Sequence, residues 1–311
     1  MFNTPSRHGD RRARCALALL FSLQFLLANA AFAKGTPDHD GVDVGSASSL
    51  RNIVPAESLE KTATQQYSQM LQEAASKKAL APDNHPQLKR LRAIAGRLIP
   101  HSYRFNERAR SWKWEINLIG SKQINAFCMP GGKIAFYTGI LDQLKLTDDE
   151  VAMVMGHEIA HALREHARER MGKQTLTNIG KGLLGIASDL AGFGGLGRAV
   201  IDGSGSLLTL KFSRDDESES DVVGLDIAAR AGYDPRAGVS LWQKMSAASK
   251  GAPPSWLSTH PAGKDRIKEI EQHLPEVMPL YERAKRASGG APHPDSMSGS
   301  ISTTSTTSTA Q

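Results

Sequence analysis

The pentapeptide His157-Glu158-Ile159-Ala160-His161 constrains this chain more than any other feature of its sequence. Residues four apart project from one face of an α-helix, so both imidazoles would reach the same metal ion, with Glu158 beside them. Zinc favours neutral imidazole nitrogens, and an open coordination position leaves room for a water whose pKa the ion lowers toward 7. Glu158 would then take the proton of this water. The spacing therefore predicts a metal-binding helix that carries its own general base.

The helix that bears this motif has a clear start in the sequence. Thr147-Asp148-Asp149-Glu150 is a capping box, in which the Thr hydroxyl and the Glu carboxylate satisfy free backbone N–H groups. From there the pattern predicts one helix that runs to about Arg170. Apolar residues at helical spacing would bury one side of it, namely Val151, Met155, Ile159 and Leu163.

A catalytic zinc site needs a third protein ligand, and an acidic cluster begins the next long helix. Its members are Asp215, Asp216, Glu217, Glu219 and Asp221. Glu217 and Asp221 are one turn apart, so Glu217 would bind the metal while Asp221 accepts a hydrogen bond from the far nitrogen of a ligating His. Glu219 would point elsewhere. The alternative is that these acids only complement the helix dipole, which is the role expected for Asp215 and Asp216.

His166 is a further candidate near the motif. Arg164 and Ala167 occupy the positions where a longer zinc motif would have Gly and His. On an ideal continuous helix His166 would be rotated by about 140° from His161. We therefore expect His166 to be structural, or to support a ligand without binding the ion.

The first 33 residues differ in composition from the rest of the chain. Arginines precede an apolar run from Cys15 to Leu27, after which Ala31-Phe32-Ala33 supplies a small-x-small cleavage pattern. The arginines are Arg7, Arg11, Arg12 and Arg14. This order predicts a cleaved signal peptide over residues 1–33, general secretion and no transmembrane span after cleavage. An uncleaved anchor helix is the alternative, because about 20 mostly apolar residues just span a bilayer.

Charge and cysteine content narrow the function further. The chain carries +6, and the signal segment, with four Arg and one Asp, holds +3 of it, so the mature protein has only about +3. Nucleic-acid binding therefore loses its main support. Cys128 is the only cysteine left after cleavage, so no intramolecular disulfide forms and the fold depends on its core. We expect its thiol to be buried.

Hydrophobic patterning predicts an α+β domain that is mostly helical. Helical spacing covers residues 55–78 and 85–98, and strand alternation follows at 112–118. Two further strands, at 123–128 and 133–137, flank the turn-forming Met129-Pro130-Gly131-Gly132 and predict a hairpin or tight bend beside the motif helix.

The remaining segments set the expected boundaries. Residues 34–52 are polar and predict a flexible lead-in outside the packed core, and residues 53–287 would form the domain. The Gly-rich stretch 175–210 predicts a mobile helical excursion near the site, and a helix would follow at 213–231. Residues 288–311 would be a disordered Ser/Thr-rich tail.

Together these residues resemble the HtpX and CAAX-prenyl-protease type of gluzincin zinc metallopeptidase. The resemblance covers residues 88–274 and rests on residues 157–163 and on Ser213-Arg214 followed by Glu217 and Asp221. Its periplasmic BepA-like branch implies one Zn²⁺ per chain and quality control of unfolded or misfolded envelope proteins, with outer-membrane assembly machinery as a partner. This chain lacks the family's membrane helices and the tetratricopeptide segment of BepA, so a preference for prenylated substrates is not carried over. Ser220 stands where an Ala is usual.

The resemblance also assigns roles to residues outside the motif. Thr259-His260-Pro261 with Arg266 beyond it matches the family's His-Pro pair and following Arg. His260 would either occupy the open position of the zinc in a resting state or stabilise the oxyanion, assisted by Arg266. An ordinary loop histidine is the alternative. Residues 125–137 match the strand beside the cleft, where an extended substrate would pair with Asn125, Ala126 and Phe127.

The sequence thus predicts an exported, periplasmic zinc metalloendopeptidase with a gluzincin-type domain. Its metal ligands would be His157, His161 and Glu217, with Glu158, His260 and Arg266 in catalysis. The competing hypothesis is a periplasmic chaperone or assembly factor whose zinc site is kept latent by His260. A structural zinc protein is a third option, which a Glu beside an open coordination position disfavours.

Overall fold

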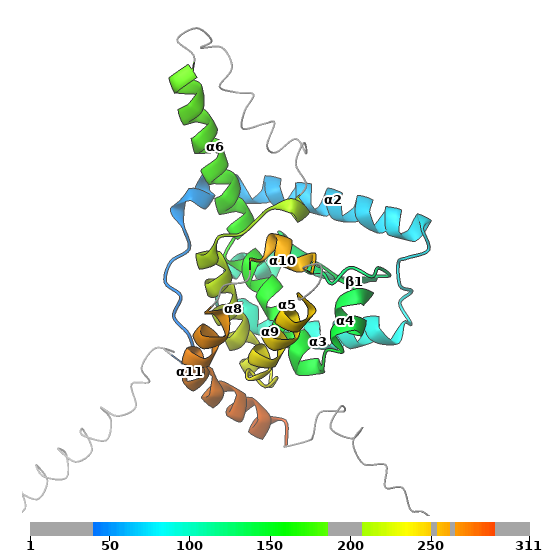
Figure 1. Cartoon of the computed structure of the whole chain (residues 1–311). Helices are drawn as coiled ribbons and strands as arrows, with labels where there is room; N and C mark the ends of the chain where they lie inside the picture. Colours follow the sequence, from blue (N-terminus) through cyan, green and yellow to red (C-terminus); the bar gives the residue numbers. More distant parts are fainter. Residues whose placement is uncertain (1–39, 186–206, 250–253, 262–264, 290–311) are drawn as a thin grey trace, which may run out of the picture. The chain divides into compact units, whose positions relative to one another are not determined.

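The computed structural model describes residues 40–185, 207–249, 254–261 and 265–289, and the described residues from Gly41 on belong to one compact unit. Its described helices are α2 (Ala56–Ser76), α3 (Pro86–Ser102), α4 (Thr138–Leu144), α5 (Asp148–Leu163), α6 (His166–Gly185), α8 (Arg214–Arg230), α9 (Ala237–Ala248), α10 (Trp256–Thr259) and α11 (Arg266–Ala287). Short 3-10 turns are η2 (Ser49–Ile53), η3 (Glu107–Ser111) and η4 (Leu207–Thr209). Three strands form the sheet, β1 (Glu115–Ile119), β2 (Ala126–Met129) and β3 (Lys133–Tyr137). The expected mostly helical α+β fold is confirmed (Figure 1).

Helix α5 is the central element of the core. Its capping box forms as predicted, with Thr147 accepting from the backbone N–H of Glu150 and the Glu150 carboxylate accepting from that of Thr147. The helix packs against α3, α8, α9 and strand β2 (Figure 1). A helix that is apolar around nearly its whole circumference is stable only when neighbours cover every side. Because α5 is buried on all sides, it cannot rotate about its axis, and the motif histidines always project in the same direction.

The sheet lies beside this helix in the order β1-β3-β2. Strand β1 pairs with β3 in parallel, and β2 pairs with β3 in antiparallel register through the predicted turn. Gly131 and Gly132 both adopt positive φ there, a conformation that costs other residues more than glycine. Among the described strands only β3 pairs with β2, so β2 is an edge strand. Cys128 on β2 is buried, as expected.

The helix of the motif does not continue to Arg170, and that prediction is wrong. Helix α5 ends at Leu163, whose carbonyl accepts from the Asn106 amide at 2.8 Å. Glu165 takes the left-handed conformation, with φ +59°, and α6 then starts at His166. No Gly or Pro marks this break, and side chains from elsewhere in the sequence contact it, with Asn106 at the Leu163 carbonyl and Arg51 at the Glu165 carboxylate.

The segment before α2 is more structured than its composition indicates. Val42 lies in the main hydrophobic core, and its N–H donates to the Asp226 carboxylate of α8 at 3.1 Å. Asp226 is fully buried and also binds Arg104 and Arg230, each at 2.7 Å. Residues 41–52 therefore pack on the domain, unlike the expected lead-in that stays outside the core.

Several expectations fall partly or wholly outside the described residues. They are the signal peptide at 1–33, the start of the lead-in at 34–39, the part of the Gly-rich stretch at 186–206 and the C-terminal tail at 290–311. Helix α6 (His166–Gly185) accounts for residues 175–185 of the Gly-rich stretch. Of the helices that the structure describes, none has the length and apolarity needed to cross a bilayer.

A glycine-to-glycine contact sets the distance between α5 and α8. A Cβ atom added to Gly156 would lie 2.9 Å from the Gly224 carbonyl oxygen, and one added to Gly224 would lie 2.8 Å from the His157 nitrogen. Side chains at either position would push the two backbones apart. Two small residues therefore bring α8 close enough for its first turns to reach the motif histidines.

We predict that Gly224→Ala destabilises the fold because the new methyl group meets backbone atoms, which cannot rotate away. Overpacking of this kind costs about 1–3 kcal/mol of unfolding free energy. The matched control is Gly96→Ala in α3, where an added Cβ meets nothing within 4 Å. That change should stabilise the protein by about 0.5–1 kcal/mol. Urea unfolding of both variants checks the pair, and equal stabilities would contradict the close crossing.

Candidate metal centre

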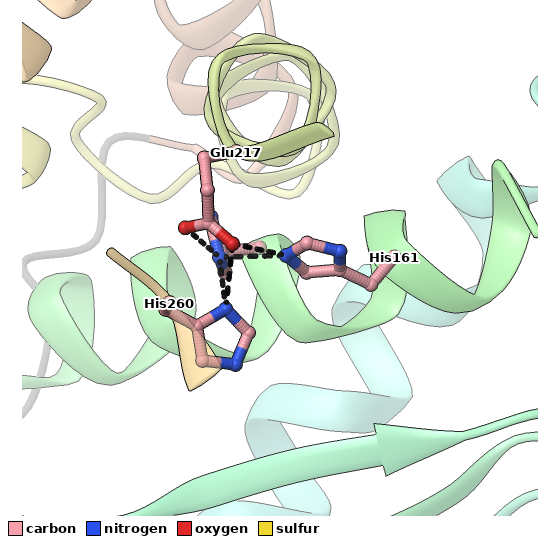
Figure 2. Close-up of side chains that lie close together, drawn as sticks. His161, Glu217 and His260 are labelled. Carbon is pink, nitrogen blue, oxygen red and sulfur yellow. Dashed lines mark hydrogen bonds and ion pairs between the residues drawn. The ribbon is translucent and has the colours of Figure 1, made fainter. Parts of the chain in front are cut away.

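Four buried side chains point their donor atoms at one another in the core. They are His157 and His161 of α5, Glu217 of α8 and His260 after α10, and their ligand atoms all lie within 4.8 Å of one another. Figure 2 shows His161, Glu217 and His260 converging from three separate elements. The two motif Nε2 atoms are 3.0 Å apart, and Glu217 Oε1 lies 3.4 Å from His161 Nε2. His260 Nδ1 lies 3.0 Å from the same carboxylate oxygen.

These separations fit a small tetrahedral ion. Ligand atoms about 2.0–2.1 Å from zinc in a tetrahedron are roughly 3.3–3.4 Å from one another. His157 Nε2 lies 3.3 Å from His260 Nδ1 and 3.6 Å from Glu217 Oε2, which completes a set close to this value. Lone pairs gathered this tightly repel one another unless protons or a cation lie between them, and one cation can serve all four side chains at once. Imidazole nitrogens and a carboxylate are also the donor types that zinc prefers.

The charges around the cluster support the same conclusion. Four carboxylates and two guanidinium groups contact the cluster or its immediate neighbours. Their net charge is −2 when the histidines are neutral. They are Glu158, Glu217, Glu219, Asp221, Arg164 and Arg266. Buried charges are costly unless opposite charges neutralise them. A divalent cation would balance this set.

Asp221 orients His157 in the way that the one-turn spacing predicts. Its Oδ1 lies 2.9 Å from His157 Nδ1, the ring nitrogen that faces away from the cluster. Burial would raise the pKa of the Asp221 carboxyl, but the Arg266 guanidinium outweighs burial and lowers that pKa below its usual value. An ionised Asp221 accepts the Nδ1 proton of His157, which leaves the Nε2 lone pair directed at the cluster.

Glu217 is fully buried and yet held in its charged form. Burial tends to raise the pKa of its carboxyl, and hydrogen bonding with His161 and His260 overcomes this and lowers the pKa well below the usual range. Arg266 Nη1 also donates to Glu217 Oε2 at 2.6 Å. The free electron pairs of Oε1 therefore face the histidines.

Arg266, which the resemblance assigns to catalysis, is buried behind the cluster. Its guanidinium is 3% exposed, binds the carboxylates of Asp221 and Glu217 and lies 4.2 Å from the ring centroid of Trp242. These partners lie behind the ligand atoms, on the side of His157 Nδ1. Arg266 is thus placed to hold the carboxylates of Glu217 and Asp221, and the assistance expected from the resemblance would act through them.

Glu158 lines the cavity next to the ligand atoms. The Trp256 indole N–H donates to its Oε1 at 2.6 Å, and His260 Nε2 lies 3.5 Å from the same oxygen. A cavity of about 50 Å³ is lined by Glu158, His161 and His260 and by residues 125–130, which include strand β2. The residues expected to bind substrate, Asn125, Ala126 and Phe127, therefore lie beside Glu158.

His260 enters the cluster with one ring nitrogen and faces Glu158 with the other. Burial would lower the pKa of this imidazole, but the nearby carboxylates of Glu158 and Glu217 raise it above the usual value. Trp256 stacks on the ring at a centroid distance of 4.7 Å. Its Nδ1 is thus one of the four donor atoms that converge in the cluster.

Aromatic side chains that enclose the histidines were not anticipated. Phe212 stacks on His161 at 4.0 Å between ring centroids, and Trp256 covers His260. Trp256 lies four residues before His260, so helical spacing offered a signal for that contact. No local pattern pointed to Phe212, which immediately precedes the cap of α8.

Comparison with known proteins agrees with this geometry. The mitochondrial metalloendopeptidase OMA1 of Arabidopsis thaliana is 36% identical over 181 residues, which are 57% of this chain and 35% of that protein. Metalloprotease LoiP of Escherichia coli is 30% identical over 209 residues, 66% of this chain and 78% of LoiP. The beta-barrel assembly-enhancing protease of Yersinia pestis is 29% identical over 173 residues, 52% of this chain and 35% of that protein. The chain thus spans about a third of the Arabidopsis and Yersinia relatives.

The resemblance to a zinc metallopeptidase family with a BepA-like branch is confirmed, since the assembly-enhancing protease is among the relatives. The relatives also include mitochondrial proteins. Residues 83–274 match the model of peptidase family M48. This segment contains α5, α8 and the His260 loop, and hence every member of the four-residue cluster. Because the match covers more than half of its residues, the chain belongs to peptidase family M48.

Proposed function

We propose that this protein is a zinc metalloendopeptidase that hydrolyses peptide bonds of unfolded or misassembled envelope proteins. The observation that carries the proposal is the convergence of His157, His161 and Glu217 on one point, with Glu158 beside it and a cavity along β2. Two imidazoles, a carboxylate and an adjacent general base are what metal-assisted peptide hydrolysis requires.

The chemistry divides among residues with separate tasks. His157, His161 and Glu217 would hold one zinc ion, which when bound activates a water and polarises the scissile carbonyl. Glu158 removes the proton of the attacking water and later delivers it to the leaving amine. The Trp256 indole holds the Glu158 carboxylate in place through its 2.6 Å hydrogen bond. Asp221 and Arg266 keep the ligands oriented from behind.

The substrate would bind as an added strand. Strand β2 is an edge strand beside the cavity, and an extended peptide that pairs with Asn125, Ala126 and Phe127 would pass Glu158. Main-chain pairing of this kind needs an extended segment and reads little of its sequence. This requirement favours unfolded proteins over folded ones as substrates.

The location and partners follow from the N-terminus and from the relatives. Residues 1–33 have the pattern of a cleaved signal peptide, which supports export to the periplasm. The Yersinia relative is named for enhancing β-barrel assembly, which supports envelope proteins as substrates and outer-membrane assembly machinery as a partner. The small positive charge of the mature chain gives no reason to propose nucleic-acid binding.

A second candidate function is a periplasmic chaperone or assembly factor that binds unfolded proteins and cleaves rarely. The position of His260 favours it, because Nδ1 of this ring stands among the ligand atoms where a water would otherwise bind. In the enzyme, substrate binding would displace His260. In the chaperone, His260 would stay in place and keep the site latent.

We predict that Glu158→Gln retains zinc but loses peptide hydrolysis, because Gln keeps the shape of the side chain and cannot accept a proton. The loss should be at least about 10²–10⁴-fold, the usual contribution of a general base. Hydrolysis of unfolded casein and metal analysis of the same sample measure the two effects.

Two results would contradict the enzyme assignment. A fully active Glu158→Gln protein would remove the mechanism. If zinc-loaded protein and its His260→Ala variant both suppress casein aggregation and leave casein intact, the chaperone function replaces it.

We predict that Glu217→Gln weakens zinc binding by more than the roughly 10–100-fold that supporting residues contribute, since it removes an anionic ligand. Asp215→Asn is the matched control, because Asp215 is an exposed acid in the first turn of the same helix. Competition with a chelator measures both affinities. Equal affinities in the two variants would exclude Glu217 as a ligand.

We predict that the mature protein begins after Ala33, because signal peptidase cleaves after small-x-small patterns. Mass spectrometry of the N-terminal peptide from an envelope fraction tests this. Recovery of peptides from residues 1–33 in the mature protein would favour the anchor-helix alternative.

A further inference from the structure

We propose that His166 and Glu219 form a hydrogen-bonded relay that fixes the orientation and the tautomer of His161. His166 and Glu219 would thus act as positioning residues of the metal centre. The proposal rests on the zinc site proposed above. It concerns the side of His161 that faces away from the cluster. Neither residue belongs to the group of four ligand candidates found among the described residues.

The relay is a continuous series of short contacts. His166 Nδ1 lies 2.9 Å from His161 Nδ1, and His166 Nε2 lies 2.6 Å from Glu219 Oε2. Arg164 Nε then donates to Glu219 Oε1 at 2.8 Å. His166 is 2% exposed and Arg164 is 6% exposed, so water competes little for the contact between the two imidazoles, whereas the Glu219 side chain at the outer end of the series is 24% exposed. Contacts of this length in a buried setting hold each ring in one orientation.

The order of donors follows from the ligand role of His161. A ring that binds metal through Nε2 carries its proton on Nδ1, so His161 must donate to His166 Nδ1. His166 Nδ1 is then an acceptor, and its own proton stands on Nε2. That proton is donated to the Glu219 carboxylate, which Arg164 holds from its other oxygen. Each nitrogen in the series thus has a single role.

The backbone break between α5 and α6 makes this contact. On a continuous helix His166 would be about 140° away from His161. Left-handed Glu165 turns the chain so that the two Nδ1 atoms meet. Backbone strain of this kind persists where surrounding contacts hold it, and here Arg168 and Arg51 bind the Glu165 carboxylate at 2.7 and 3.3 Å.

The two motif histidines are therefore supported differently. Asp221 contacts His157 directly, whereas Glu219 reaches His161 through an intervening imidazole. A supporting carboxylate makes the attached imidazole a better electron donor. In this centre the Glu219 carboxylate is separated from the metal ligand His161 by the imidazole ring of His166.

The test compares zinc affinity, by chelator competition, in His166→Leu, His166→Asn and Glu219→Gln. Leu removes the acceptor for His161, whereas the Asn side-chain oxygen can occupy the place of His166 Nδ1. We expect His166→Leu to weaken zinc binding by roughly 10–100-fold, and His166→Asn to restore it to within about tenfold of the unaltered protein. Glu219→Gln should give an intermediate loss. The absorption bands of the cobalt-substituted protein should shift in His166→Leu, because the orientation of one ligand has changed.

His85→Leu is the control for lost stability. His85 caps α3 by accepting from the Gln87 N–H, at 3.2 Å and away from the metal centre. This variant should unfold at a lower temperature and keep both zinc affinity and cobalt spectrum. If His166→Leu does not fold, Glu219→Gln decides between the outcomes.

Two results would overturn the relay. One is unchanged zinc affinity and cobalt spectrum in His166→Leu or, if that variant does not fold, in Glu219→Gln. The other is a loss in His85→Leu as large as that in His166→Leu. In both cases the unaltered protein still binds zinc and the proposed function stands. If the unaltered protein binds no zinc, the proposed function fails together with the relay.

Discussion

The contact between Gly156 and Gly224 is the constraint on which the metal centre depends. It lets α8 approach α5 until a carboxylate of one helix meets the imidazoles of the other, with Glu217 Oε1 3.4 Å from His161 Nε2. Neither helix could form the cluster alone, because each supplies only part of the ligand set. Packing in the core thus determines where the ligand atoms lie, and the burial of α5 among apolar neighbours keeps them there.

Charge compensation is the second condition. Buried carboxylates are costly, and Arg266 offsets part of that cost by binding Glu217 and Asp221 from behind the ligand atoms. The imidazole nitrogens and the Glu217 carboxylate that face inward are the donor types that suit a divalent cation. His260, whose pKa the neighbouring carboxylates raise, is the one ring of the cluster that comes from a short loop rather than a long helix.

Local patterns predicted the parts of the site that depend on local geometry. The capping box, the motif helix, the hairpin and the one-turn spacing of Glu217 and Asp221 all reflect a helical or strand period that the sequence shows directly. The break at Glu165 was missed, because contacts from distant residues stabilise it without Gly or Pro. Val42 was assigned to a flexible segment because its anchor, Asp226, is 184 residues away in the chain. For Arg266 the family likeness indicated a role, and only the fold shows which carboxylates it binds.

In the proposed centre, two imidazoles and one carboxylate share a single zinc ion. X-ray absorption at the zinc edge of the purified, zinc-loaded protein measures this coordination. We expect only nitrogen and oxygen neighbours at about 2.0–2.1 Å, with the outer-shell scattering of at least two imidazoles. A sulfur neighbour at about 2.3 Å, or fewer than two imidazoles, would contradict it.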